Sequence, residues 1–199
     1  MLPSVVADSD GSQSVTIFDW SLPLGVDGSP GSIDGTLNWV PSSSPVVWIL
    51  VVVGFTAVGF VVLRSHQFRI PAAVTITAAL ALMVAIGAFL AQPSAVRVSG
   101  IDIIGPAVAI VIGGYALFRQ RTQASAATRI AAVAAAALIA WAVLRIDVLT
   151  HPLLPTLLAA TVDRFLTSVV LGASLGVLGA VILSPAAATP GASRATTVE

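Results

Sequence analysis

The chain of 199 residues contains no cysteine and little charge. Without cysteine it can form no disulfide, thiolate zinc site, iron–sulfur cluster or covalently attached haem. Only 9% of its residues are charged, whereas a soluble domain carries about 25%, so an ordinary soluble globule is excluded. Lysine is absent as well, and nine arginines balance nine acidic residues to a formal net charge of zero. The lack of a basic excess argues against a nucleic-acid partner.

Apolar sequence is what the chain has in abundance. Hydrophobic residues make up 57% of it, and the mean hydropathy is +1.00. A helix needs about 20 apolar residues to cross a bilayer. Five stretches meet this need, at about 46–63, 72–91, 101–118, 130–148 and 157–183. The predicted fold class is an all-α integral membrane protein with a five-helix transmembrane bundle over residues 46–184. We expect a short extracytoplasmic β-hairpin in the tail before it (1–45) and a cytoplasmic disordered tail after it (185–199).

The arginines predict how the bundle is oriented. Two short loops carry an excess of them: Arg64 and Arg69 after the first span, and Arg119, Arg121 and Arg129 after the third. Because basic loops stay in the cytoplasm, we expect the N-terminus outside and the C-terminus inside a bacterial cytoplasmic membrane. The chain opens without a recognisable signal peptide. Either the first span acts as a reverse anchor, or further sequence precedes Met1.

The tail before the first span has a strand-like pattern between residues 14 and 41. Apolar residues that alternate with polar ones share a face. The residues expected on one face are Thr16, Phe18, Trp20 and Leu22 in the first segment and Ile33, Leu37 and Trp39 in the second. An isolated two-stranded hairpin is only marginally stable in water. The pattern therefore predicts that another surface covers the hairpin at Phe18, Trp20 and Trp39: strands upstream of Met1, the chain's own loops or a binding partner. The alternative is that the two tryptophans anchor at the lipid headgroups.

The last span contains glycines at helical spacing. Gly172 and Gly176 have the small-xxx-small spacing that lets two helices approach closely, and Gly179 extends the row. These glycines predict helix packing inside the bundle. The alternative is homo-oligomerisation through the same face.

The mid-depth of the five spans is expected to hold no ionisable side chain. This makes a proton relay, a membrane haem site or an intramembrane protease dyad improbable. The ionisable residues instead gather at the exterior helix ends. The predicted charged collar consists of Arg97, Asp102, Arg145, Asp147, Asp163 and Arg164. We expect its members to form ion pairs that fix the positions of the helix ends.

A metal site at this collar is the main chemical alternative. His151, together with Asp147 or Asp163, would supply part of a copper or zinc ligand set. The set is incomplete, so a copper site would need ligands from a partner or from missing sequence. The sequence indicates no other cofactor.

Short motifs carry a resemblance. They are Asp19–Leu24 (DWSLPL), Gly35–Val40 (GTLNWV), Thr150–Pro155 (THPLLP) and Asp163-Arg164. In these the chain resembles a family of poorly characterised actinobacterial multi-pass membrane proteins. In that family an extracytoplasmic β-rich region ends in a tryptophan-containing hairpin that leads into several membrane helices. The resemblance implies an extracytoplasmic region upstream of Met1. The layout is also similar to that of some copper-handling membrane proteins, but this chain lacks their methionine and histidine clusters.

These observations predict a non-catalytic membrane protein. We expect an accessory or assembly subunit of a larger membrane complex, with a copper-related role as the most specific form, and with the lipid bilayer and other membrane subunits as partners. The alternative is a small transporter or channel, which would need a polar pathway. The residues available for such a pathway are Thr75, Thr77, Tyr115, Ser168 and Ser174.

Overall fold

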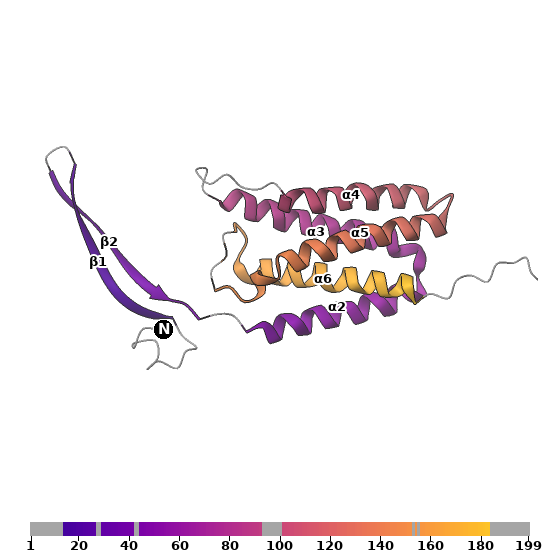
Figure 1. The fold of residues 1–199 in the computed structure, drawn as a ribbon, viewed down its shortest axis with the longest axis horizontal. Helices are drawn as coiled ribbons and strands as arrows, with labels where there is room; N and C mark the ends of the chain where they lie inside the picture. Colours follow the sequence, from indigo (N-terminus) through magenta and orange to yellow (C-terminus); the bar gives the residue numbers. More distant parts are fainter. Residues whose placement is uncertain are drawn as a thin grey trace, which may run out of the picture. The chain divides into compact units, whose positions relative to one another are not determined.

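The computed structural model describes residues 14–26, 29–41, 44–92, 101–152, 154 and 156–183. The chain divides into two compact units. One unit comprises Met1–Pro45 with Asp147–Leu154, and the other comprises Val46–Ile146 with Pro155–Glu199. Each is described by itself below (Figure 1). The predicted tail at 185–199 and Arg97 lie outside the described residues.

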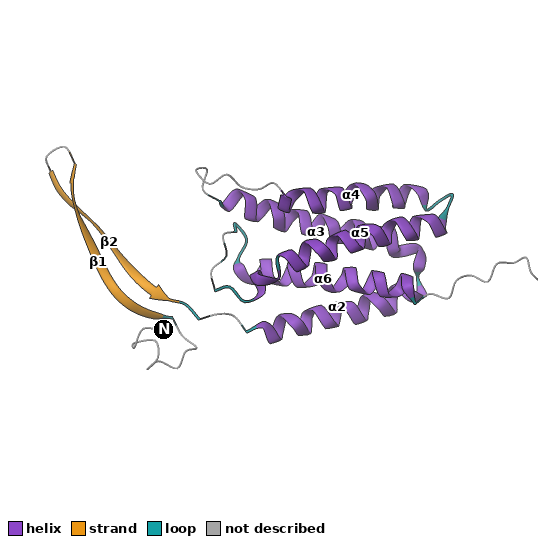
Figure 2. Cartoon of the chain, in the orientation of Figure 1, coloured by secondary structure: helices purple, strands orange, loops and turns teal. Residues whose placement is uncertain are grey.

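The first unit contains an antiparallel hairpin of two long strands, β1 (Val15–Val26) and β2 (Ser29–Trp39) (Figure 2). Phe18 pairs with Leu37 and Leu22 with Ile33, so these apolar side chains share a face. The register shifts between Thr16 and Phe18. Such a bulge adds one residue to a strand and inverts the alternation of its side chains.

The bulge changes the place of Thr16. Thr16 pairs with Asn38, the neighbour of Leu37, and therefore lies on the face opposite Phe18. Its hydroxyl donates to the side-chain oxygen of Asn38 at 2.7 Å. The expectation that Thr16 shares a face with Phe18 is wrong, because the alternation rule does not foresee an extra residue.

The second unit is helical. In the described residues, five helices are long and apolar enough to cross a membrane. They are α2 (Pro45–Ser65), α3 (Ile70–Ala91), α4 (Ile101–Arg119), α5 (Ala124–Leu144) and α6 (Ala160–Ile182). The short 3-10 helices η1 (Gln67–Arg69) and η2 (Ile146–Leu149) follow α2 and α5. The predicted fold class, an all-α bundle of five spans preceded by a β-hairpin, is confirmed.

The fourth span differs most from its predicted bounds. Hydropathy places its start after Arg129, but α5 begins at Ala124 because the alanine-rich first turn is a strong helix former. It ends at Leu144, after which the chain continues as η2. The polar residues Thr128 and Arg129 thus belong to the helix.

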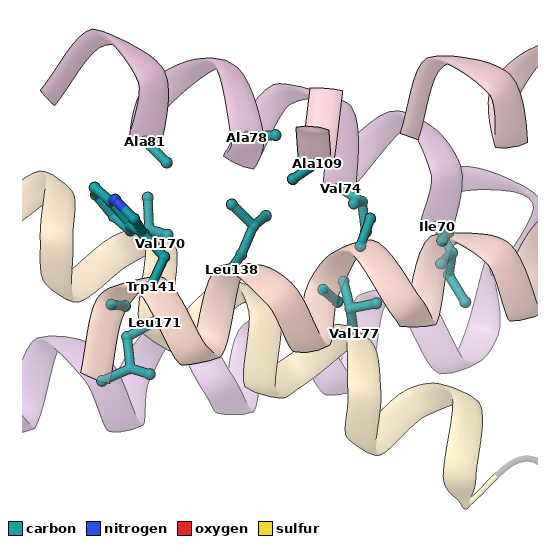
Figure 3. Close-up of a cluster of buried hydrophobic side chains, with 14 of the residues drawn as sticks. Ile70, Val74, Ala78, Ala81, Ala109, Leu138, Trp141, Val170, Leu171 and Val177 are labelled. Carbon is teal, nitrogen blue, oxygen red and sulfur yellow. The ribbon is translucent and has the colours of Figure 1, made fainter. Parts of the chain in front are cut away.

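Helices α3 and α6 are the most buried of the five described spans. Helix α3 packs against α4, α5 and α6, and α5 lies between α4 and α6. Many core positions are alanine, including Ala78, Ala81 and Ala109, which lets the helices approach closely. Leu138 projects from α5 into this space, as Figure 3 shows. The core is therefore filled by a few large side chains set against small ones.

Five of the arginines gather at one end of the bundle. The side chain of Gln120 donates to the carbonyl oxygen of Phe68, so the α2–α3 and α4–α5 connections lie side by side. We call this the arginine end. The residues that define it are Arg64, Arg69, Arg119, Arg121 and Arg129. No Asp or Glu of the described residues lies there, because Asp102 and Asp163 occupy the first turns of α4 and α6 at the opposite end. Its assignment to the cytoplasm stays a prediction.

The three predicted glycines face α2. A Cβ atom at Gly172 would lie 2.5 Å from the carbonyl oxygen of Val52, and one at Gly176 would lie 2.9 Å from that of Thr56. At Gly179 it would meet only the ring of Phe60, at 3.3 Å. Helices α2 and α6 thus touch backbone to backbone at the first two glycines.

We expect Gly172→Ala and Gly176→Ala each to lower the free energy of unfolding by about 1–3 kcal/mol, because the added methyl meets immobile backbone. Gly179→Ala is the matched control. It should cost less than about 1 kcal/mol, since an aromatic ring can shift. Denaturant unfolding of the purified protein in micelles measures all three. Equal costs at the three positions would contradict this packing.

Candidate functional site

A polar network connects the first turn of α4 with the end of α5 and the start of α6. It begins at Pro106, which lies inside α4. Proline has no N–H, so the carbonyl of Asp102, four residues earlier, loses its usual helical donor. The indole Nε1 of Trp141 on α5 donates to this carbonyl oxygen at 2.9 Å. A neighbouring helix thus satisfies the backbone group that the proline leaves unpaired, as a bilayer interior requires.

The same tryptophan supports a buried ion pair. The guanidinium carbon of Arg145 lies 5.3 Å from the centroid of the Trp141 ring, at cation–π distance. The Nη2 atom of Arg145 lies 3.4 Å from Oδ1 of Asp163 on α6. Thr167, one turn further along α6, donates its hydroxyl to the same oxygen at 3.4 Å. The side chains of Arg145 and Asp163 are only 10% and 1% exposed, so the charges are enclosed by protein.

Some polar atoms of the network lack a partner. Within the described part of the chain, Nε of Arg145 and Oδ2 of Asp163 are buried without a hydrogen bond, and so is the hydroxyl of Ser174 deeper in α6. A buried unsatisfied polar atom is costly and calls for a physical reason. Arg164 is buried too, and its carbonyl accepts from Ser168 at 2.8 Å. The start of α6 is therefore the most polar part of the bundle interior.

The structure distributes the predicted collar over different environments. Arg145, Asp163 and Arg164 are buried, while Asp102 contributes its main-chain carbonyl. Asp147 belongs to the first unit and is exposed. Of the ion pairs expected in the collar, the described residues show the one between Arg145 and Asp163.

His151 lies beside Asp147. Its Nδ1 atom is 2.8 Å from the main-chain oxygen of Asp147 and 3.9 Å from the carboxylate, and both side chains are more than half exposed. Among the described residues, no three histidine, cysteine or acidic side chains lie close enough together to hold a metal ion. This pair could supply two ligands of a site completed by another molecule.

The hydroxyls expected to line a transport pathway are mostly satisfied within their own helices. Thr75 donates to the carbonyl of Pro71, and Thr77 to that of Ala73, each at 2.8 Å. Tyr115 instead accepts from Arg119 at 2.8 Å, at the arginine end. Ser174 is the member of the predicted set that is left without a partner in the described structure.

The hairpin gathers the predicted partner-binding residues. The register places Phe18 and Trp20 on one face of β1 and Trp39 on the same face of β2. Trp20 lies across Gly35, where a Cβ atom would come within 2.5 Å of the indole ring. The opposite face carries polar pairs, among them Asp19 with Thr36 and Ser21 with Asp34. The hairpin is therefore apolar on one face and polar on the other.

Sequence analysis missed the contact between Pro106 and Trp141. A proline inside a span and a tryptophan near the same end of the next span were visible signals. A proline inside a membrane helix requires a substitute donor for the carbonyl four residues earlier, and indole N–H is a donor only. This rule could have paired the two.

We expect Asp163→Ala to lower the free energy of unfolding by about 3–5 kcal/mol, because it leaves the guanidinium of Arg145 buried without a counter-charge. Adding Arg145→Leu should recover part of that loss. The exposed Asp147 gives a control, and Asp147→Ala should cost no more than about 0.5 kcal/mol. Unfolding in micelles measures each variant. If the double variant is less stable than Asp163→Ala, the cost of Asp163→Ala does not come from an uncompensated charge on Arg145.

We expect Trp141→Phe to cost about 1–3 kcal/mol by leaving the Asp102 carbonyl unpaired. Pro106→Ala supplies a backbone N–H in place of the indole donor. In that background Trp141→Phe should cost less, by about 1 kcal/mol. The lost ring volume is the same in both backgrounds and cancels. An equal cost with and without the proline would show that the indole does not substitute for the helical donor.

Comparisons of the chain with family models, with curated proteins and with solved structures found no match. Function is therefore inferred from two features of the chain itself. One is the buried polar network of α4, α5 and α6, and the other is the two-faced hairpin.

Proposed function

We propose that this protein is a non-catalytic multi-pass membrane protein that serves as an accessory or assembly subunit of a larger membrane complex. The observation that carries this proposal is the uncovered apolar face of the hairpin. Its large apolar side chains are 38–53% exposed in the described structure. They are Phe18, Trp20, Leu22, Leu24, Ile33 and Leu37.

The energetics favour a covered state of this face. Burial of one large apolar side chain stabilises by about 1.5–3 kcal/mol when it is complete. Six half-exposed side chains on one face would therefore release several kcal/mol on docking, before the entropy cost of association. Each strand also has one edge whose backbone groups have no neighbouring strand in the described sheet. A second protein that presents an apolar sheet face would satisfy both needs.

The charge of the hairpin favours protein over lipid as the covering surface. Residues 14–41 contain the acidic residues Asp19, Asp27 and Asp34 and no basic residue. Anionic headgroups attract basic segments and repel acidic ones. Anchoring of Trp20 and Trp39 among headgroups is therefore the less favourable way to cover the apolar face.

A copper-related role is the most specific form of this proposal. Asp147 and His151 give an exposed pair of ligand types. Copper would be held only if the partner added ligands to this pair. On this account the subunit would present or position a site that the complex completes.

Transport is the second candidate function. It is favoured by the buried Arg145–Asp163 pair with its unpartnered Nε and Oδ2 atoms, because ionisable groups inside membrane proteins often mark ion pathways. In proteoliposomes, a transporter would show saturable flux that Asp163→Asn abolishes.

A face-specific photo-crosslinking experiment tests the accessory role. A photoreactive amino acid is placed at Trp20 or Leu22 on the apolar face, and at Ser21 or Thr36 on the polar face as matched controls. We expect the apolar positions to give one recurrent protein adduct in native membranes, and the polar positions to give little, because only the apolar face is covered. Mass spectrometry identifies the adducts.

The outcomes separate the alternatives. Adducts to lipid alone at the apolar positions would favour headgroup anchoring and contradict the proposal. Equal yields from both faces would show that the hairpin has no docked face. The Trp20→Ser variant should lose co-purification of the same protein while the chain still inserts into the membrane.

A further inference from the structure

An apolar groove runs along the outside of the bundle between α2, α3 and α6. Its free volume is about 200 Å³. The α2 wall includes Phe55, Val58 and Val62, and the other two helices contribute the small residues Ala73 and Ala173. Every lining residue is apolar. In a bilayer such a groove faces acyl chains, because the surrounding solvent at this depth is hydrocarbon.

The groove has the length of an acyl segment and ends at the arginine end. Its α2 residues run from Phe55 to Leu63, which is about 12 Å at the rise of an α-helix. Half of the hydrocarbon core of a bilayer measures about 15 Å. Arg64 directly follows the last groove residue of α2, and Arg69 lies one helical turn before Ala73. Two arginines therefore flank the point where the groove reaches the membrane surface.

Both arginines are exposed and near aromatic rings. The guanidinium carbon of Arg64 lies 5.7 Å from the ring centroid of Phe60, and that of Arg69 lies 5.3 Å from the ring centroid of Phe68. No acidic residue of the described chain neutralises them, since the acids of the bundle lie at its opposite end. Guanidinium groups bind phosphate through paired N–H donors.

We propose that an anionic glycerophospholipid binds at this place, with one acyl chain in the α2–α3–α6 groove and its phosphate at Arg64 and Arg69. The apolar groove selects the chain, and the two positive charges select an anionic headgroup. The lipid would also support α2, which packs against α6 through the glycine face. This inference is independent of the accessory role, because it uses neither the hairpin nor a protein partner.

Native mass spectrometry of the purified, delipidated full chain tests the proposal. The protein is titrated with phosphatidylglycerol and with phosphatidylcholine that carries identical acyl chains. We expect phosphatidylglycerol to bind about 30-fold more tightly, since each arginine near a headgroup contributes about fivefold. The Arg64→Gln/Arg69→Gln variant should remove this preference. It should weaken phosphatidylcholine binding less than phosphatidylglycerol binding, because the choline cation already offsets the phosphate charge of phosphatidylcholine.

Two further variants locate the site. Ala73→Leu fills the groove and should weaken binding of both lipids, with an unfolding temperature near that of the wild type. Arg121→Gln removes the same charge at the same end of the bundle, but Arg121 does not line the groove, and the change should alter either affinity less than about twofold.

Three results would overturn the proposal. The first is equal affinity for the two lipids in the wild type. The second is an equal loss from Arg121→Gln and the double arginine variant, which would mean diffuse attraction rather than a site. The third is displacement of bound phosphatidylglycerol by inorganic phosphate at equal concentration, which would mean an anion site without a role for the groove.

Discussion

The buried ion pair between Arg145 and Asp163 is the interaction on which the arrangement of α4, α5 and α6 depends. A charge enclosed in an apolar interior is tolerated only when a counter-charge and hydrogen bonds meet it. Asp163 meets this condition by contact with Arg145 and Thr167, and Arg145 also lies over Trp141. Trp141 in turn donates a hydrogen bond to the Asp102 carbonyl of α4. A displacement of any one of these helix ends would therefore leave several buried polar groups without their partners.

Helix α2 packs against the bundle through backbone contacts at glycines rather than through polar side chains. Gly172 and Gly176 remove the side chains that would hold α2 away, so backbone meets backbone. In a bilayer, close van der Waals packing replaces the hydrophobic effect as the force between helices. The same small side chains leave the groove beside α2, where Ala73 and Ala173 line it. One composition bias, small residues on facing helices, thus produces both a tight contact and a space that lipid can fill.

The two units of the chain differ in how they pair their polar groups and cover their apolar side chains. The bundle pairs most of its inward polar groups internally, down to the carbonyl that Pro106 leaves without a donor. The hairpin instead keeps a row of large apolar side chains exposed while it pairs polar ones on its other face. Soluble elements rarely keep such a face uncovered. This contrast supports a hairpin that docks and a bundle that holds it at the membrane.

Much of this fold could be predicted from the sequence, because the signals are local. Long apolar runs predicted the five spans, and alternation around Phe18 and Trp20 predicted the hairpin. The bulge beside Thr16 could not be predicted, since it depends on how two strands pair. The burial of the Asp163 side chain could not be predicted either, because it results from the packing of α5 on α6. The early start of α5 follows from helix propensity at Ala124, which a hydropathy window does not measure.

Hydrogen–deuterium exchange of the hairpin tests the central claim most directly. Amide exchange of β1 and β2 is compared between native membranes and the purified chain in detergent, with α5 as the internal reference. A docked hairpin should exchange slowly in native membranes and much faster after purification, while α5 stays protected in both. Equally fast exchange of the hairpin in both preparations would contradict the claim that its apolar face is covered by another subunit.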